Sequence, residues 1–232
     1  MDGPAGDVSE QVVITREGLA DGSLLKQIRS RLPPGVIART DAEIAASLAE
    51  TLTAHDPADD VWVFGYGSLM WNPAFDYAER QVGVVRGWHR RFCLWLTMGR
   101  GSPGNPGLML ALDVGGTCRG VAFRIPAERA RAELLLIWRR EMFGTAYLAR
   151  WIQVRTACGV VPAITFVVNR TSARYAGSIA DADAAAHIAT ATGALGSCRA
   201  YFDSTVTHLD ALQISDAGLQ RIAAHMERYR RR

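Results

Sequence analysis

Val61-Trp62-Val63-Phe64-Gly65 is the stretch of sequence from which the fold class follows most directly. Its apolar run of β-branched and aromatic residues is short and ends at a glycine, which predicts a buried β-strand. Further candidate strands follow in quick succession and are separated by turn residues. They span residues 82–85, 91–96, 108–114, 119–125, 151–155 and 163–168.

Helical patterns flank these strands. Thr40 and Glu43 have capping-box spacing, and Ile44, Leu48 and Leu52 then recur every fourth residue, which predicts a short amphipathic helix. Because the strands gather early in the chain and the helices late, the sequence predicts an α+β domain built on a curled sheet or barrel. The other predicted helices span residues 127–142, 180–194, 198–212 and 216–229.

The composition is that of an ordinary globular protein. The 232 residues are 49% hydrophobic and 21% charged, which argues against a disordered chain and favours one large domain. The net charge is only 26 − 23 = +3, so it does not point to a nucleic-acid partner. No run approaches the roughly 18 apolar residues of a membrane span, and residues 1–10 do not resemble a secretory signal. We therefore expect a cytoplasmic protein with no nucleic-acid or membrane partner.

The N-terminal part divides into three segments. Residues 1–11 are expected to be frayed, and residues 12–34 carry few periodic signals and are predicted to form an extended arm. Residues 12–60 together are expected to pack on the core as an arm and a helix. Residues 61–232 then form the main domain.

Cysteine and histidine usage gives no sign of a metal site or a disulfide framework. The four cysteines are isolated, without a CxxC pair, and the five histidines are scattered. We expect no metal, and we expect all four cysteines to be buried and inert. They are Cys93, Cys118, Cys158 and Cys198.

The turn after the first strand, Gly65-Tyr66-Gly67-Ser68-Leu69, is the first candidate for chemistry. Two glycines directly after a strand can adopt positive φ and point successive backbone N–H groups into one concavity, which suits an anion such as a carboxylate. Met70 excludes a dinucleotide-binding GxGxxG loop, and Tyr66 and Met70 exclude a GxSxG nucleophile elbow. A plain turn remains the alternative interpretation.

Glu141 is the second candidate. On a helix it shares one stripe with Leu134, Ile137 and Trp138, whereas Arg140 points elsewhere. A carboxylate on an apolar stripe is partly desolvated, which raises its pKa toward the range useful for proton transfer. The alternative is a solvated helix-end glutamate paired with Arg140.

Other residues give weaker signals. Arg91 is a candidate to clamp an acid group, although Arg90 and Arg91 alternate faces on a strand, so at most one enters a cleft. Tyr147 and Tyr201 are candidates to offer a hydroxyl to a substrate, with a core position as the alternative.

Taken together, the order and spacing of these motifs resemble the ChaC family, the glutathione-specific γ-glutamylcyclotransferases. The resemblance runs from about Val12 to the end of the chain. The segments that carry it are residues 63–71, 90–92, 100–107, 120–123 and 138–142, followed by 174–177 and 195–201.

The resemblance implies a small mixed β-barrel flanked by helices, with a catalytic domain over residues 61–232, no metal and no cofactor. It implies a lyase that cleaves glutathione to 5-oxoproline and cysteinylglycine. Glu141 falls on the family's catalytic glutamate, and residues 65–69 fall on its substrate-binding loop; we add Arg91, Tyr147 and Tyr201 as candidate substrate contacts. The alternatives are a cyclotransferase for other γ-glutamyl amines or peptides and a non-catalytic γ-glutamyl-binding protein.

Overall fold

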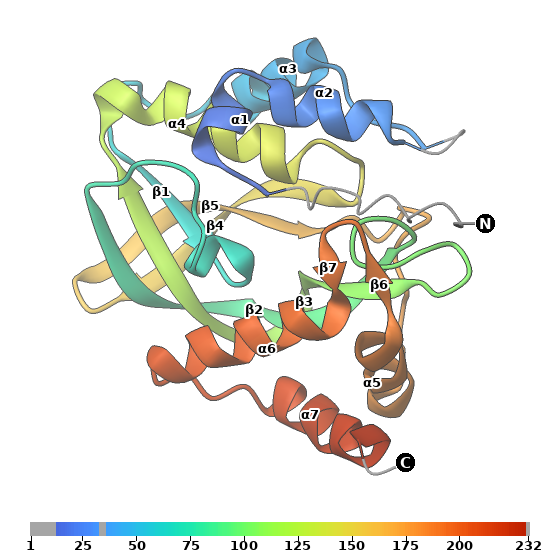
Figure 1. The fold of residues 1–232 in the computed structure, drawn as a ribbon. Helices are drawn as coiled ribbons and strands as arrows, with labels where there is room; N and C mark the ends of the chain where they lie inside the picture. Colours follow the sequence, from blue (N-terminus) through green and yellow to red (C-terminus); the bar gives the residue numbers. More distant parts are fainter. Residues whose placement is uncertain (1–12, 33–35, 231–232) are drawn as a thin grey trace.

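A closed five-stranded β-barrel forms the centre of the computed structural model, which describes residues 13–32 and 36–230 (Figure 1). Strand β1 (Val61–Gly65) pairs antiparallel with β3 (Gly107–Ile125) and parallel with β5 (Gly159–Val168). The remaining strands, β2 (Glu79–Leu96) and β4 (Tyr147–Thr156), complete the order β1-β3-β2-β4-β5. The predicted α+β class and the mixed barrel are confirmed.

Strands β2 and β3 are longer than the sequence predicts. Each combines two predicted strands, 82–85 with 91–96 and 108–114 with 119–125. Three glycines that lie between the predicted strands, Gly87, Gly115 and Gly116, have positive φ, and β2 shifts register between Arg86 and Trp88. An irregularity of this kind bends a strand without ending it, so a glycine inside the pattern marks a bend here.

Four helices lie on one side of the barrel (Figure 1). The extended arm predicted over residues 12–34 is wrong, because α1 (Arg16–Ala20) and α2 (Ser23–Ser30) lie there. Their buried Leu19, Leu24 and Leu25 join the main core. Helix α3 (Asp41–Thr51) begins at the predicted capping box, and α4 (Ala127–Glu141) matches its predicted span. The frayed segment expected over residues 1–11 lies outside the described residues.

Three helices lie on the opposite side (Figure 1). Helix α5 (Asp181–Thr190) ends earlier than predicted, because the chain turns into a hairpin of β6 (Thr192–Gly193) and β7 (Gly196–Ser197). Helices α6 (Cys198–Ala211) and α7 (Ala217–Arg230) follow as predicted. Among the described residues, no helix combines the length and the apolar character needed to cross a membrane.

Candidate active site

A cavity opens at the end of the barrel where β1 and β5 end and where β3 and β4 begin. It has a volume of about 340 Å³, part of it open to solvent. Three barrel strands, the turn after β1, and helices α4 and α6 contribute residues to it. The lining residues are Tyr66, Gly67, Ser68, Leu69, Met109, Leu110, Glu141, Tyr147, Phe166 and Tyr201.

The turn after β1 contributes backbone donors to this cavity. Ser68–Met70 forms a single 3₁₀ turn, η1, in which the Met70 amide donates to the Gly67 carbonyl at 2.9 Å. Among the described residues, no oxygen accepts a hydrogen bond from the amides of Gly67, Ser68 or Leu69. The first amides of a helical turn lack an internal partner, so these three are available to an anion.

The glycines of this turn serve a purpose other than the one predicted. Neither Gly65 nor Gly67 has positive φ, and Gly67 has a φ of −135°. What requires glycine is close approach, because a Cβ on Gly67 would lie 3.2 Å from the Tyr201 hydroxyl. A Cβ on Gly65 would lie 3.0 Å from the Leu69 Cβ, so a side chain there would displace the turn.

Glu141 is both buried and paired, so the structure combines the two predicted alternatives. Its side chain is 16% exposed, and its Oε1 lies 3.0 Å from the Arg140 Nε. Burial raises the pKa of the Glu141 carboxyl, and the Arg140 charge opposes that rise. The carboxylate therefore faces the cavity in an environment suited to accepting a proton.

Arg140 belongs to the site, although we expected it to point elsewhere. Its side chain is only 5% exposed, and its Nη2 donates to the Ser68 Oγ at 2.7 Å. Its Nη1 donates to the Asn72 carbonyl oxygen. One guanidinium thus joins the carboxylate to both ends of the η1 turn. Arg140 comes four residues after the buried Leu136, so the two side chains lie on the same face of α4. This spacing could have predicted that the Arg140 side chain faces inward.

Three tyrosines surround the carboxylate. The Tyr66 hydroxyl donates to the Phe166 carbonyl and the Tyr147 hydroxyl to the Leu110 carbonyl, both at 2.7 Å. The Tyr201 hydroxyl has no hydrogen-bond partner among the described residues. Burial, and after it the nearby Glu141, raises the pKa of Tyr201, so its hydroxyl stays protonated and can donate to a ligand.

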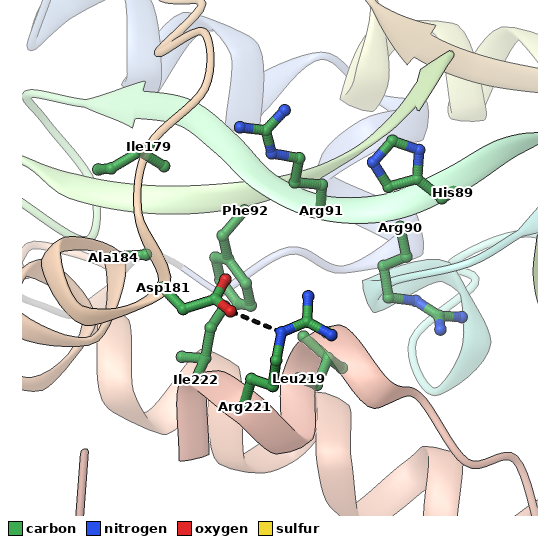
Figure 2. Close-up of a pocket in the computed structure, with 11 residues that line it drawn as sticks. His89, Arg90, Arg91, Phe92, Ile179, Asp181, Ala184, Leu219, Arg221 and Ile222 are labelled. Atoms are coloured by element: carbon green, nitrogen blue, oxygen red, sulfur yellow. Dashed lines mark hydrogen bonds and ion pairs between the residues drawn. The ribbon is translucent and has the colours of Figure 1, made fainter. Parts of the chain in front are cut away.

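Arg91 does not reach this cavity. In Figure 2, Arg91 and Phe92 extend from opposite faces of β2. The Arg91 guanidinium donates to the Gly177 carbonyl at 2.7 Å and lies 3.4 Å from Asp113. Strand alternation predicts two faces but does not say which one meets the site, and the inward face belongs to Arg90. The expectation that Arg91 contacts a substrate here is therefore wrong for this cavity, because Arg91 does not line it.

Arg90 supports the site from behind. Its side chain is 1% exposed, and its Nε donates to the Tyr66 carbonyl at 2.6 Å while its Nη1 pairs with Asp216 at 2.7 Å. Arg90 and Arg91 both border a second cavity between β2, α5 and α7, where Arg221 pairs with Asp181 at 2.6 Å (Figure 2). The arginines and the aspartate of this second cavity are therefore already paired.

The expected burial holds for three of the four cysteines. Cys93, Cys118 and Cys198 are buried, but Cys158 is exposed because it lies in the tight turn between β4 and β5. Within residues 13–32 and 36–230, no three His, Cys, Asp or Glu side chains are grouped closely enough to hold a metal ion.

Free backbone amides, a buried carboxylate and a free hydroxyl therefore share one cavity. The amides can hold a carboxylate, and Glu141 can take a proton from a group held beside them.

The chain is similar to known proteins. A family model described as ChaC-like protein matches residues 61–229. A glutathione-specific γ-glutamylcyclotransferase of Escherichia coli (strain K12) is 45% identical over 176 residues, which cover 75% of this chain and 76% of that protein. The glutathione-specific γ-glutamylcyclotransferase 1 of Homo sapiens is 39% identical over 102 residues, which cover 41% of this chain and 46% of the human protein.

Similarity in structure covers about three quarters of the chain. The crystal structure of a yeast γ-glutamyl cyclotransferase specific to glutathione superposes with a TM-score of 0.66 at 22% identity, over 73% of this chain and 96% of that chain. At this identity the superposition shows the shared fold alone. The family match and the 45% identity confirm the resemblance seen in the sequence: the chain belongs to the ChaC-like protein family.

Proposed function

We propose that this protein is a lyase that converts glutathione into 5-oxoproline and cysteinylglycine. The observation that carries the proposal is the buried Glu141 carboxylate facing the free amides of residues 67–69 in one cavity. Membership of a family that includes the Escherichia coli glutathione-specific γ-glutamylcyclotransferase supports it. We place the reaction in the cytoplasm.

The chemistry is an intramolecular substitution. The α-amino nitrogen of the γ-glutamyl group attacks its own γ-carbonyl carbon, and the bond to the cysteinyl nitrogen breaks. At neutral pH the amine is mostly an ammonium, so a base must first remove a proton. Because nucleophile and electrophile belong to one molecule, the enzyme has only to hold a folded conformer and manage protons and charge.

Glu141 is the proposed base. Its buried carboxylate takes one proton of the ammonium, and the resulting carboxylic acid gives that proton to the departing cysteinylglycine nitrogen. The second proton that the attacking nitrogen loses as the lactam forms goes to the product amine, which leaves as an ammonium. Because burial raises its pKa, the carboxylate takes up the ammonium proton more readily than a carboxylate in water does, and the resulting acid is still strong enough to protonate a departing amine.

The remaining site residues are proposed to position the substrate. The amides of Gly67, Ser68 and Leu69 hold the α-carboxylate next to the amine, which fixes the γ-glutamyl group in the cavity. The protonated Tyr201 hydroxyl is available to the γ-carbonyl oxygen as negative charge develops there. Tyr66 and Tyr147 keep the cavity wall in place through their bonds to backbone carbonyls of β5 and β3, and Gly65 gives the turn room to form.

The decisive experiment is incubation of the purified protein with glutathione and, separately, with γ-glutamyl-alanine, followed by quantification of 5-oxoproline. We expect 5-oxoproline and cysteinylglycine in equal amounts from glutathione. Product from the dipeptide alone would favour a cyclotransferase for other γ-glutamyl compounds. Binding of glutathione without product would favour a non-catalytic binding protein.

A further inference from the structure

Two partly buried arginines next to the cavity lack the carboxylate partner that others have. Arg90, for comparison, is balanced by Asp216. Among the described residues, Arg100 and Arg174 pair with backbone carbonyls and with no carboxylate. Burial lowers the pKa of both guanidinium groups, and only tyrosine or cysteine groups oppose the effect. A desolvated cation without a counter-charge is costly, which points to an anionic ligand.

Arg100 is held firmly in the loop between β2 and β3. The Leu195 amide of the β6–β7 hairpin donates to the Gly99 carbonyl at 2.7 Å, and Gly99 has a φ of +82°. The Arg100 Nη1 donates to the Ser197 carbonyl at 3.0 Å. Figure 1 shows this loop and the hairpin side by side. The guanidinium is therefore pre-positioned, which reduces the entropy lost on binding a ligand.

Tyr201 connects Arg100 to the active site. The Arg100 guanidinium carbon lies 5.4 Å from the centroid of the Tyr201 ring. The hydroxyl end of the same ring lies next to Gly67, in the loop proposed to bind the α-carboxylate. Only the Nη1 of Arg100 donates to a described residue, so its Nε and Nη2 are available.

The surroundings of Arg100 make its lack of a carboxylate more costly. Ser197, which accepts its hydrogen bond, is the N-cap of α6, and the N-terminus of a helix carries partial positive charge. A guanidinium and a helix N-terminus thus lie together with no described anion between them. A carboxylate bound to Arg100 would relieve both.

On the basis of the proposed function, we infer that Arg100 binds the carboxylate at the glycine end of glutathione. Glutathione has two carboxylates, and an extended tripeptide spans roughly 10 Å. The free amides of residues 67–69 take one carboxylate, and Arg100 takes the other across the Tyr201 ring. Arg100 is then a specificity-determining residue that favours the tripeptide over γ-glutamyl compounds without a second carboxylate.

The test compares glutathione with its glycine monoethyl ester, in which this carboxylate is neutral. For the wild-type protein we expect kcat/KM to be roughly ten- to a hundredfold higher with glutathione, the effect of one charge-assisted hydrogen bond. In Arg100→Gln this preference disappears, because KM for glutathione rises while the values for the ester stay unchanged. Arg100→Lys, which keeps a charge, retains part of the preference. Thermal unfolding of each variant verifies that it is folded.

Arg174→Gln is the matched control, because Arg174 is also half-buried and has no described carboxylate partner. The inference would be overturned if Arg174→Gln lost the preference for glutathione over the ester while Arg100→Gln kept it. An equal loss of activity on both substrates in Arg100→Gln would also overturn it, as would a wild-type protein that does not distinguish them. Absence of 5-oxoproline from either substrate with the wild-type protein would instead overturn the proposed function itself.

Binding gives a readout that is independent of turnover. Titration calorimetry of Glu141→Gln with glutathione and with the ester measures the same discrimination without catalysis. Addition of Arg100→Gln to that variant is expected to weaken glutathione binding and to leave ester binding unchanged. Equal weakening for both ligands would contradict a direct contact with the glycine carboxylate.

Discussion

Glu141 and Arg140 are adjacent in sequence and act on each other through opposing physical effects. Burial disfavours the charged carboxylate and raises its pKa, whereas the guanidinium 3.0 Å away favours the charged form. A base in this reaction must be deprotonated before substrate binds. Activity is therefore lost as the pH falls through the pKa of Glu141.

This balance predicts the acidic limb of the pH profile. In the wild-type protein the acidic limb of kcat/KM, which reports the free enzyme, is expected above pH 4.5, the ordinary value for a glutamic acid. In Arg140→Gln the limb moves to higher pH, because the stabilising positive charge is gone. Arg140→Lys is the control that keeps the charge, and its limb stays closer to the wild-type position. A limb that moves to lower pH in Arg140→Gln would refute this account.

At the scale of single residues, the sequence predicted part of the site. Glu141 could be found because a 3.6-residue period places it on the apolar stripe of α4. Arg91 was assigned wrongly because alternation along β2 separates two faces without identifying the inner one. The role of Arg100 depends on the contact between its loop and α6, which joins segments far apart in sequence.

The β1 strand and the turn after it depend on close packing against β3. A Cβ on Gly120 of β3 would overlap the Gly65 carbonyl oxygen and lie 2.7 Å from the Phe64 Cζ. Backbone cannot yield as a flexible side chain can, so a methyl group at Gly120 must displace the end of β1. The turn that holds the free amides moves with it.

Gly120→Ala is therefore expected to lower the free energy of unfolding by about 1–3 kcal/mol and to reduce turnover. The matched control is Gly104→Ala, because no atom lies within 4 Å of a Cβ at that position. We expect the control to stay within about 0.5 kcal/mol of the wild-type protein. Chemical denaturation and 5-oxoproline formation measure both effects. A Gly120→Ala protein with wild-type stability and turnover would show that the close contact between Gly120 and the end of β1 does not constrain the turn.

At the scale of elements, the sequence predicted long periodic helices better than short ones. The capping box at Thr40 correctly predicted the start of α3, and the periodic apolar residues of α4 correctly predicted its span. Helices α1 and α2 have only 5 and 8 residues, too few turns for a period to emerge, and tertiary packing stabilises them. The breaks predicted within β2 and β3 are bends at glycines. The two strands remain paired with each other on both sides of these bends.

The whole molecule is held together partly by a buried carboxylate, Glu133, which lies about two turns before Glu141 on α4. Glu133 of α4 accepts two hydrogen bonds from Arg16 of α1, at 2.5 and 2.7 Å, and a third from the Asp76 amide at 2.8 Å. It thereby ties the N-terminal helices to the barrel side. The hydrogen bonds from Arg16 are the main cause that lowers the pKa of Glu133.

A lowered pKa in the folded state means that Glu133 stabilises the protein above its unfolded pKa, near 4.5, and that this contribution is lost as the pH falls. Glu133→Gln is expected to lower the free energy of unfolding at pH 7 by about 1–2 kcal/mol. This value is at the low end for a buried ion pair because Arg16 is partly exposed to solvent. The difference from the wild-type protein narrows in acid. The control is Glu128→Gln, whose side chain is 73% exposed. A difference that is constant with pH would contradict the proposed linkage.

In the proposed reaction, the barrel, its two groups of helices and the end cavity together place one carboxylate beside the γ-glutamyl amine. The most direct test is the rate of 5-oxoproline formation from glutathione by Glu141→Gln, measured beside the wild-type protein and Glu128→Gln. We expect Glu141→Gln to lose at least about a hundredfold in kcat, the usual contribution of a general base, while it still binds glutathione and Glu128→Gln keeps full activity. Full turnover by Glu141→Gln would contradict the assignment of Glu141 as the base.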